Sequence, residues 1–221
     1  MLVFPLEAVE DPISVNWLAA VYARDTVILK QLVYTIEDIN QQTNKGLSAL
    51  MAAAARGDNR LIVLLLEHNA RPDQLNNRGG TALMYAAAMN NIESINLLIS
   101  HKADVNIRAE NGWTALTLAA AKGNETIVNN LLNATANPNI PDVYGWTPLM
   151  RAIEHDRMKS SAVLIRNQKT QLNRINSKGQ SALHIAAGLA RCDTVKLLIE
   201  FGADQQLLDF KNQSPLLGNL C

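Results

Sequence analysis

Apolar and polar positions repeat along this chain at an interval of 33 residues. A hydroxyl residue, then Ala or Pro, then Leu, occurs at 48–50, 81–83, 114–116, 147–149, 181–183 and 214–216, and one interval is 34 residues. Small pairs such as Ala53-Ala54 and aliphatic pairs such as Leu65-Leu66 follow at nearly the same offsets in most copies. A fixed period of this length predicts a stacked solenoid, not a globule built around a central site.

Each copy is predicted to form a turn followed by two helices. Two residues before the hydroxyl stands Gly, or Asn212 in the last copy, and both residue types tolerate a positive φ. The Ser or Thr then supplies the N-cap of a short first helix. A break near Gly57 and its equivalents precedes a longer second helix, which carries the aliphatic pair. One unit alone leaves an apolar side exposed, so neighbouring units are expected to stack.

This pattern resembles the ankyrin repeat, which has a 33-residue period and a Thr-Pro-Leu-His-x-Ala signature. The stretch 103–106, Ala-Asp-Val-Asn, is similar to the usual end of a unit in that family. The resemblance covers roughly residues 14–221 and implies an all-α solenoid of stacked helix-turn-helix units with β-turn fingers. The family's His after the Leu remains only at His184, for which we expect a structural role.

We expect one continuous domain with atypical units at both ends. The predicted parts are an N-terminal arm at 1–13, a degenerate N-terminal cap repeat at 14–47, repeats at 48–80, 81–113, 114–146, 147–180 and 181–213, and a short C-terminal cap helix at 214–221. The repeat at 147–180 contains one extra residue, so an altered loop is expected near 168–173. Degenerate end units are typical of repeat proteins, because they cover the exposed ends of the stack.

Composition excludes several functional classes. Lys and Arg number 20 and Asp and Glu number 20, so the formal net charge is zero. A strongly basic nucleic-acid binder and a polybasic membrane anchor are therefore not expected. No apolar run approaches the roughly 18 residues of a membrane span, and the start has no basic region typical of a signal peptide. We expect a cytoplasmic protein that is monomeric without its partner.

The two cysteines leave one alternative open. They are too few for a disulfide scaffold or a four-cysteine zinc site, and Cys192 and Cys221 are both predicted near the same end of the stack. A disulfide between them would indicate a bacterial periplasmic or secreted location, provided that a leader peptide had been removed. Two reduced thiols in a cytosolic protein are the simpler interpretation.

Catalytic motifs are absent from the sequence. It contains no Gly-x-Ser-x-Gly, Walker loop, HExxH or CxxC, and the histidines fall in different repeats. We therefore expect no enzyme activity, no cofactor and no metal. The alternative is an enzyme that uses the consecutive residues Glu154, His155 and Asp156, which would require these groups to converge in a pocket.

The resemblance implies that a partner docks on the concave side, which the turn tips and first helices form. Trp113 and Trp146 are one period apart and are expected to be anchors, because exposed aromatics dominate many interfaces. The alternative is that each ring packs over its neighbouring turn. Lys45, Arg56, Arg78 and Lys122 give the first half of this side a basic character that would suit an acidic rim, unless they are only a solvated surface. The candidate contact residues are Lys45, Arg56, Arg78, Met89, Asn111, Trp113, Lys122, Tyr144, Trp146, His155 and Phe210.

These observations predict a non-enzymatic protein–protein interaction module that binds a folded partner and regulates or inhibits it. Two alternatives remain open besides the enzyme. One is a bacterial self-protection protein that inhibits a harmful enzyme. The other is a scaffold or chaperone that supports a partner enzyme, in which case the partner's activity would rise and not fall.

Overall fold

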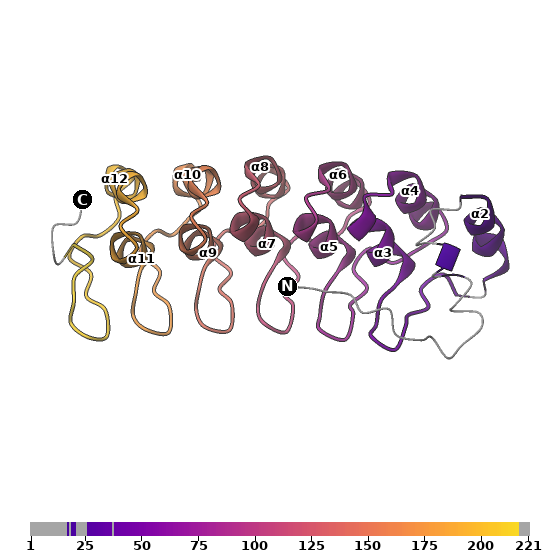
Figure 1. Cartoon of the computed structure of the whole chain (residues 1–221), viewed down its shortest axis with the longest axis horizontal. Coiled ribbons are helices and arrows are strands. Elements are labelled where there is room, and N and C mark those ends of the chain that lie inside the picture. The colour runs from indigo at the N-terminus through magenta and orange to yellow at the C-terminus, as the bar shows by residue number, and fades with distance from the viewer. Residues whose placement is uncertain (1–16, 18, 21–25, 37, 217–221) are drawn as a thin grey trace.

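The computed structural model describes residues 17, 19–20, 26–36 and 38–216, and within them it contains helices and no strand. The helices form two parallel rows along an elongated stack (Figure 1). The inner row consists of α3 (Ala49–Arg56), α5 (Ala82–Ala88), α7 (Ala115–Lys122), α9 (Pro148–Glu154) and α11 (Ala182–Gly188). The outer row consists of α2 (Thr26–Thr35), α4 (Asn59–Glu67), α6 (Ile92–Ser100), α8 (Glu125–Asn133), α10 (Met158–Arg166) and α12 (Cys192–Glu200). The all-α solenoid expected from the sequence is confirmed, while the predicted arm at 1–13 lies outside the described residues.

Every inner helix begins where the repeated hydroxyl predicts. In each case the side-chain oxygen accepts a hydrogen bond from the backbone N–H three residues later, which stabilises the helix start by about 1 kcal/mol. The capping residues are Ser48, Thr81, Thr114, Thr147 and Ser181. Pro148 occupies the first position of α9, where its missing N–H leaves no helical bond unmade.

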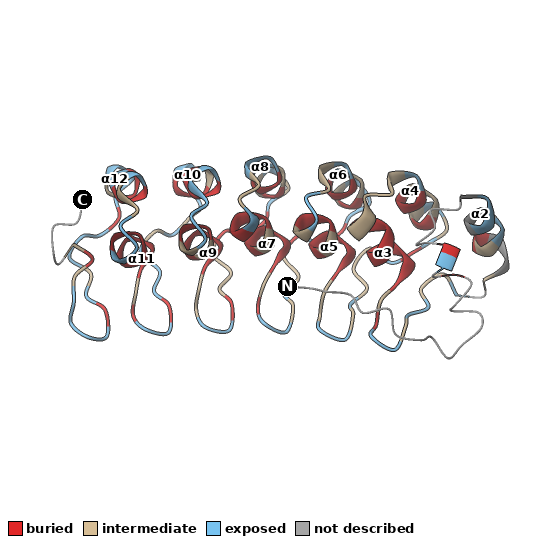
Figure 2. Cartoon of the chain, viewed as in Figure 1, coloured by how far each residue is buried: buried red, intermediate tan, exposed pale blue. Residues whose placement is uncertain are grey.

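The core runs as a continuous band between the two rows. Alanines such as Ala53 and Ala86 on the inner helices are completely buried, and so are Leu65 and Leu98 on the outer helices. Figure 2 shows that the inner helices are mostly buried, whereas exposed residues lie on much of the loops and on the outer helices. Small residues on the inner helices allow adjacent repeats to approach closely, so each repeat buries its apolar side against its neighbours.

The turns between successive units project from the inner row as a line of fingers along one edge of the stack (Figure 1). Each finger turns at a residue with positive φ, such as Gly112 at +80°. The backbone N–H of one tip donates to a tip carbonyl of the preceding finger at 2.9 to 3.3 Å. The donor and acceptor pairs are Asn77 and Lys45, Glu110 and Arg78, Val143 and Asn111, Ser177 and Tyr144, and Phe210 and Lys178. The finger tips therefore form one hydrogen-bonded ribbon.

The return loops that follow the outer helices are joined by side chains. An Asn or Asp oxygen of one loop accepts a backbone N–H of the next loop at 2.7 to 2.9 Å. The accepting residues are Asn40, Asp73, Asn106, Asn139 and Asn173. The loop after α10 differs from the others, because Asn167 is extended and no residue with positive φ follows it as Thr135 follows α8.

His184 ties the last complete repeat to the finger that follows. Its Nδ1 accepts the backbone N–H of Ser181 at 3.2 Å, which leaves the proton on Nε2. Nε2 then donates to the carbonyl of Gln213 at 3.1 Å. The structural role expected for this His is thus observed. Beyond it, 215–216 form a turn and 217–221 lie outside the described residues, so the cap helix at 214–221 stays a prediction.

Candidate partner-binding surface

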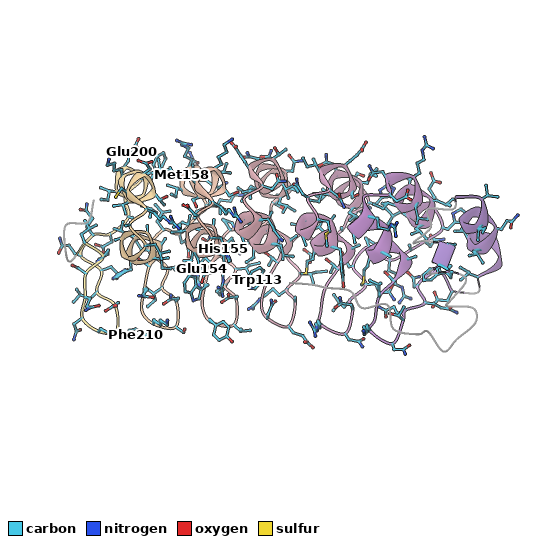
Figure 3. All side chains as sticks on the ribbon, viewed as in Figure 1. Trp113, Glu154, His155, Met158, Glu200 and Phe210 are labelled. Carbon is cyan, nitrogen blue, oxygen red and sulfur yellow. The ribbon has the colours of Figure 1, made fainter. Side chains whose placement is uncertain are left out.

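The candidate surface, called the finger face here, consists of the six fingers and the inner helices beside them. The fingers comprise 43–46, 76–79, 109–112, 142–145, 176–179 and 209–212. This face contains the residues predicted from the sequence to contact a partner. Figure 3 shows Glu154 and His155 beside α9, Trp113 near them, and Phe210 at the end of the last finger.

Arg151 on α9 joins the two tryptophans into one cluster. Its guanidinium carbon lies 5.5 Å from the ring centroid of Trp113 and 4.7 Å from that of Trp146. A guanidinium at these distances is attracted to the faces of both rings. The cluster therefore spans the third and fourth fingers and fixes the two indoles relative to each other.

Two carboxylates hold Arg151 in place. The buried Asp142 accepts from Nε at 2.9 Å and also from Nη2, and Glu154 accepts from Nη1 at 2.8 Å. The other oxygen of Asp142 accepts the backbone N–H groups of Tyr144 and Trp146, both at 2.9 Å. Burial acts to lower the pKa of Arg151, but the hydrogen bonds and charges of Asp142 and Glu154 outweigh it and raise the pKa above its ordinary value. Arg151 is therefore a fixed cation.

The tryptophans are less exposed than the sequence suggested. Both are half-buried, and Trp146 packs against the core, so the packing alternative applies at least in part to Trp146. The physical reason is Arg151, which fills the space between the rings. Within the described part of the chain neither indole N–H has a hydrogen-bond acceptor, and neither is sealed from solvent. Each can still donate to a bound partner.

The sequence reasoning missed Arg151, although a signal was present. The equivalent position on the other inner helices holds Ala52, Tyr85, Leu118 or Ile185. Arg151 thus occupies a repeat position that is otherwise apolar or aromatic, and two tryptophans one period apart lie near it in the sequence. This combination indicates a buried or stacked cation. Aligning the repeats position by position would have identified it.

The other predicted aromatic and apolar contacts reach solvent. Tyr144 is 63% exposed and Phe210 is 70% exposed, both at finger tips, and Met89 at the end of α5 is also exposed. A Cβ built on Gly179 would come within 2.6 Å of the Phe210 ring, so this ring also lies over the preceding finger. Asn111 is exposed, and its Oδ1 accepts the Trp113 backbone N–H at 3.0 Å.

The basic candidates divide between two places on the finger face. Lys45 and Arg78 are exposed at finger tips. Lys122, the last residue of α7, is exposed, and Arg56, the last residue of α3, is half-buried. All four thus lie on the first half of the face, where the sequence reasoning placed them.

The three residues proposed for an enzyme point to different neighbours. The His155 ring lies 3.7 Å from Glu154, which is already bound to Arg151. Asp156 pairs instead with Arg191 of the next repeat at 3.0 Å. Among the described residues, no group of three His, Cys, Asp or Glu side chains is placed to hold a metal ion. The arrangement therefore gives no support to the enzyme alternative.

Two further sequence expectations concern location. None of the helices in the described ranges has the length and apolar character required to cross a membrane. Cys192 is the half-buried first residue of α12 and is disulfide-bonded, so the interpretation of a reduced thiol is wrong for this residue. Cys221 lies outside the described residues, and its pairing with Cys192 stays a prediction.

Asp209 is expected to make the last finger sensitive to acid. Its Oδ1 accepts the backbone N–H groups of Gln213 at 3.0 Å and Lys211 at 2.8 Å. These bonds, with a smaller effect of nearby positive charge, hold the pKa of Asp209 below its ordinary value. Because this pKa is lower in the folded chain than in the unfolded chain, the stabilisation is present above about pH 4 and is lost as the pH falls through the folded-state value.

We expect the amide protons of Lys211 and Gln213 to lose protection from hydrogen exchange at acid pH. The fifth finger is the internal control, because Asn176 makes the same two bonds with an amide oxygen that does not titrate. Asp209→Asn should remove the pH dependence. If both fingers lose protection equally in the unmodified protein, the carboxylate is not the cause.

Comparison with known proteins agrees with this architecture. Residues 17–109 and 103–175 match a family model described as Ankyrin repeats (3 copies), and residues 178–206 match one described as Ankyrin repeat. The ankyrin repeat domain of Bcl-3, described as a unique member of the IkappaB protein family, is 25% identical with a TM-score of 0.85, covering 95% of this chain and 94% of that chain. The ankyrin repeat domain of human ASB11 is 21% identical with a TM-score of 0.78, covering 94% and 90%, and it shows the fold alone. A search of curated proteins finds no significant match.

Proposed function

The chain belongs to the ankyrin repeat family, whose repeats are protein–protein interaction modules, and we propose that it binds a folded partner protein on its finger face and regulates it. The observation that carries this proposal is the Trp113–Arg151–Trp146 cluster. Two indoles are held in one orientation before a partner arrives, and both N–H groups remain available. Aromatic anchors that need no reordering lose less conformational entropy on binding, so they contribute more to affinity.

We propose that the regulation takes the form of inhibition. The fingers are joined by backbone hydrogen bonds and the inner helices by a continuous core, so the face can cover an area of a partner without deforming. Covering an active site or an assembly surface blocks it. A self-protection protein that inhibits a harmful enzyme is one version of this proposal. A scaffold would use the same surface, but it would raise the activity of its partner and not lower it.

Co-purification from the source cells tests the proposal. The tagged chain should recover one partner protein in stoichiometric amount, identified by mass spectrometry. Adding the purified chain to that partner should then lower the partner's activity. A rise in activity would favour the scaffold, and recovery of no stoichiometric protein would contradict the proposal.

The cysteines test the location of the protein. Cys192 is disulfide-bonded, a state typical of the periplasmic or secreted alternative and not of the cytoplasm. Mass spectrometry should therefore find Cys192 alkylated only after reduction in protein taken from its native compartment. Alkylation of Cys192 without reduction would contradict the disulfide and favour a cytoplasmic location.

A further inference from the structure

The second tip residue of each finger forms a column of exposed side chains along the edge of the finger face. Four of the six are cations, and none is an acid. In chain order they are Lys45, Arg78, Asn111, Tyr144, Lys178 and Lys211. The first tip residues are exposed as well, and among them only Glu110 carries a charge. The finger edge is therefore positive although the chain as a whole is formally neutral.

The cations form two pairs on neighbouring fingers, one near each end of the ribbon. The backbone hydrogen bonds between tips fix the spacing within each pair, since Lys45 and Lys178 supply carbonyls that the next finger binds. Arg78 and Lys178 make no ion pair within the described part of the chain. Lys211 is close enough to act on the charge of Asp209, but that carboxylate is bound by the turn. Like charges held in this way favour a ligand that carries negative charge.

The middle of the column is neutral and belongs to the two fingers that carry the aromatic cluster. Asn111 and Tyr144 occupy the third and fourth tips, the same two fingers whose stems carry Trp113 and Trp146. Asn111 is bonded directly to the Trp113 backbone. An aromatic centre flanked by charged groups on both sides is the usual anatomy of a protein–protein interface, in which the centre supplies affinity and the rim supplies orientation.

We infer that the partner surface has an apolar or aromatic centre with carboxylates on both sides. The centre rests on the Trp113–Arg151–Trp146 cluster, and the carboxylates lie beside Arg78 at one end and beside Lys178 and Lys211 at the other. This inference rests on the proposed function and specifies the chemistry of the partner. A protein fits better than a nucleic acid, because a phosphate backbone requires cations along its whole footprint. Here Glu110, Val143 and Tyr144 interrupt the cations at the centre.

Fluorescence anisotropy with synthetic probes tests the inference. The main probe is a labelled peptide with a Leu-Trp-Leu centre between two runs of Glu and Asp. One comparison peptide has Lys in place of every acid, and the third probe is a single-stranded oligothymidine. The tested variant is Arg78→Glu with Lys178→Glu, one cation from each pair. The matched control is Lys159→Glu with Lys196→Glu, which makes the same change in charge at exposed positions of α10 and α12.

The acidic peptide should bind the unmodified protein, and salt should weaken the binding. The tip variant should lose at least about tenfold in affinity, while the control should change by less than about twofold. The inference is overturned if the acidic peptide does not bind, if both variants lose affinity equally, or if the Lys peptide or oligothymidine binds as tightly. The proposed function would survive that outcome if the co-purified partner still binds and depends on the tryptophans.

Discussion

Asp142→Ala is expected to lower the free energy of unfolding by about 3 to 5 kcal/mol, measured by urea denaturation followed by circular dichroism. Asp142 is only 4% exposed, and its two oxygens accept bonds from two backbone N–H groups and from the Arg151 guanidinium. Its removal leaves Arg151, whose side chain is 14% exposed, with only Glu154 to balance its charge. A half-buried cation that loses one of its partners is costly because it has also lost part of its hydration.

A second variant distinguishes two effects of removing Asp142: the unbalanced charge of Arg151 and the lost hydrogen bonds to the turn. The third finger has Ala109 at the position of Asp142, and that finger still closes with backbone bonds of 2.8 and 2.9 Å. The turn therefore does not require the carboxylate. Asp142→Ala combined with Arg151→Leu, which copies Leu118 of α7, should recover more than half of the lost stability. A double variant as unstable as Asp142→Ala alone would show that Arg151 is not the cause.

Gly112→Ala is expected to destabilise the chain by about 3 kcal/mol, because two separate costs add. Gly112 has a φ of +80°, a region that L residues enter only with strain. A Cβ there would also lie 2.7 Å from the Asp142 Cα and 2.8 Å from the Val143 backbone N, so neighbouring backbone must move. The displaced atoms belong to the finger that holds Arg151. Urea denaturation should show the loss, and tryptophan fluorescence should show whether the cluster is disturbed.

Gly188→Ala is the matched control, and its effect has the opposite sign. Gly188 ends α11, is exposed, and has no atom within 4 Å of the place where its Cβ would lie. Its φ is not in the left-handed region. Ala at a helical position loses less conformational entropy on folding than Gly, so this variant should gain about 0.5 to 1 kcal/mol. Equal destabilisation by both substitutions would contradict the steric account of Gly112.

The architecture could be predicted because residues within each unit determine its caps, its turn and its packing positions. An N-cap such as Thr114, a turn residue such as Gly112 and the small pair Ala119-Ala120 act over a few residues, and the period repeats them. The hydrogen bonds between return loops follow the same period. Aligning the repeats would have revealed their acceptors, which are Asn40, Asp73, Asn106, Asn139 and Asn173. The fold could therefore be predicted from the spacing of these residues alone.

The candidate site was only partly predictable because its contacts cross repeats. Trp113 and Trp146 could be placed on adjacent fingers by their spacing, but spacing does not show that one guanidinium fills the gap between them. Arg151 belongs to the fourth repeat, and Trp113 to the third. The buried position of Asp142 likewise depends on a side chain nine residues away. Side-chain orientation on the assembled stack decides these contacts, and no local pattern encodes it.

The most direct measurement of the central claim is the affinity of the purified partner for Trp113→Ala combined with Trp146→Ala, by isothermal titration calorimetry. The matched control is Phe201→Ala, which removes an exposed aromatic at the end of α12 in the outer row. If the cluster anchors the partner, the double variant should bind at least about a hundredfold more weakly while circular dichroism shows that it remains folded. The control should bind like the unmodified chain. Unchanged binding by the folded double variant, or an equal loss in the control, would contradict the account.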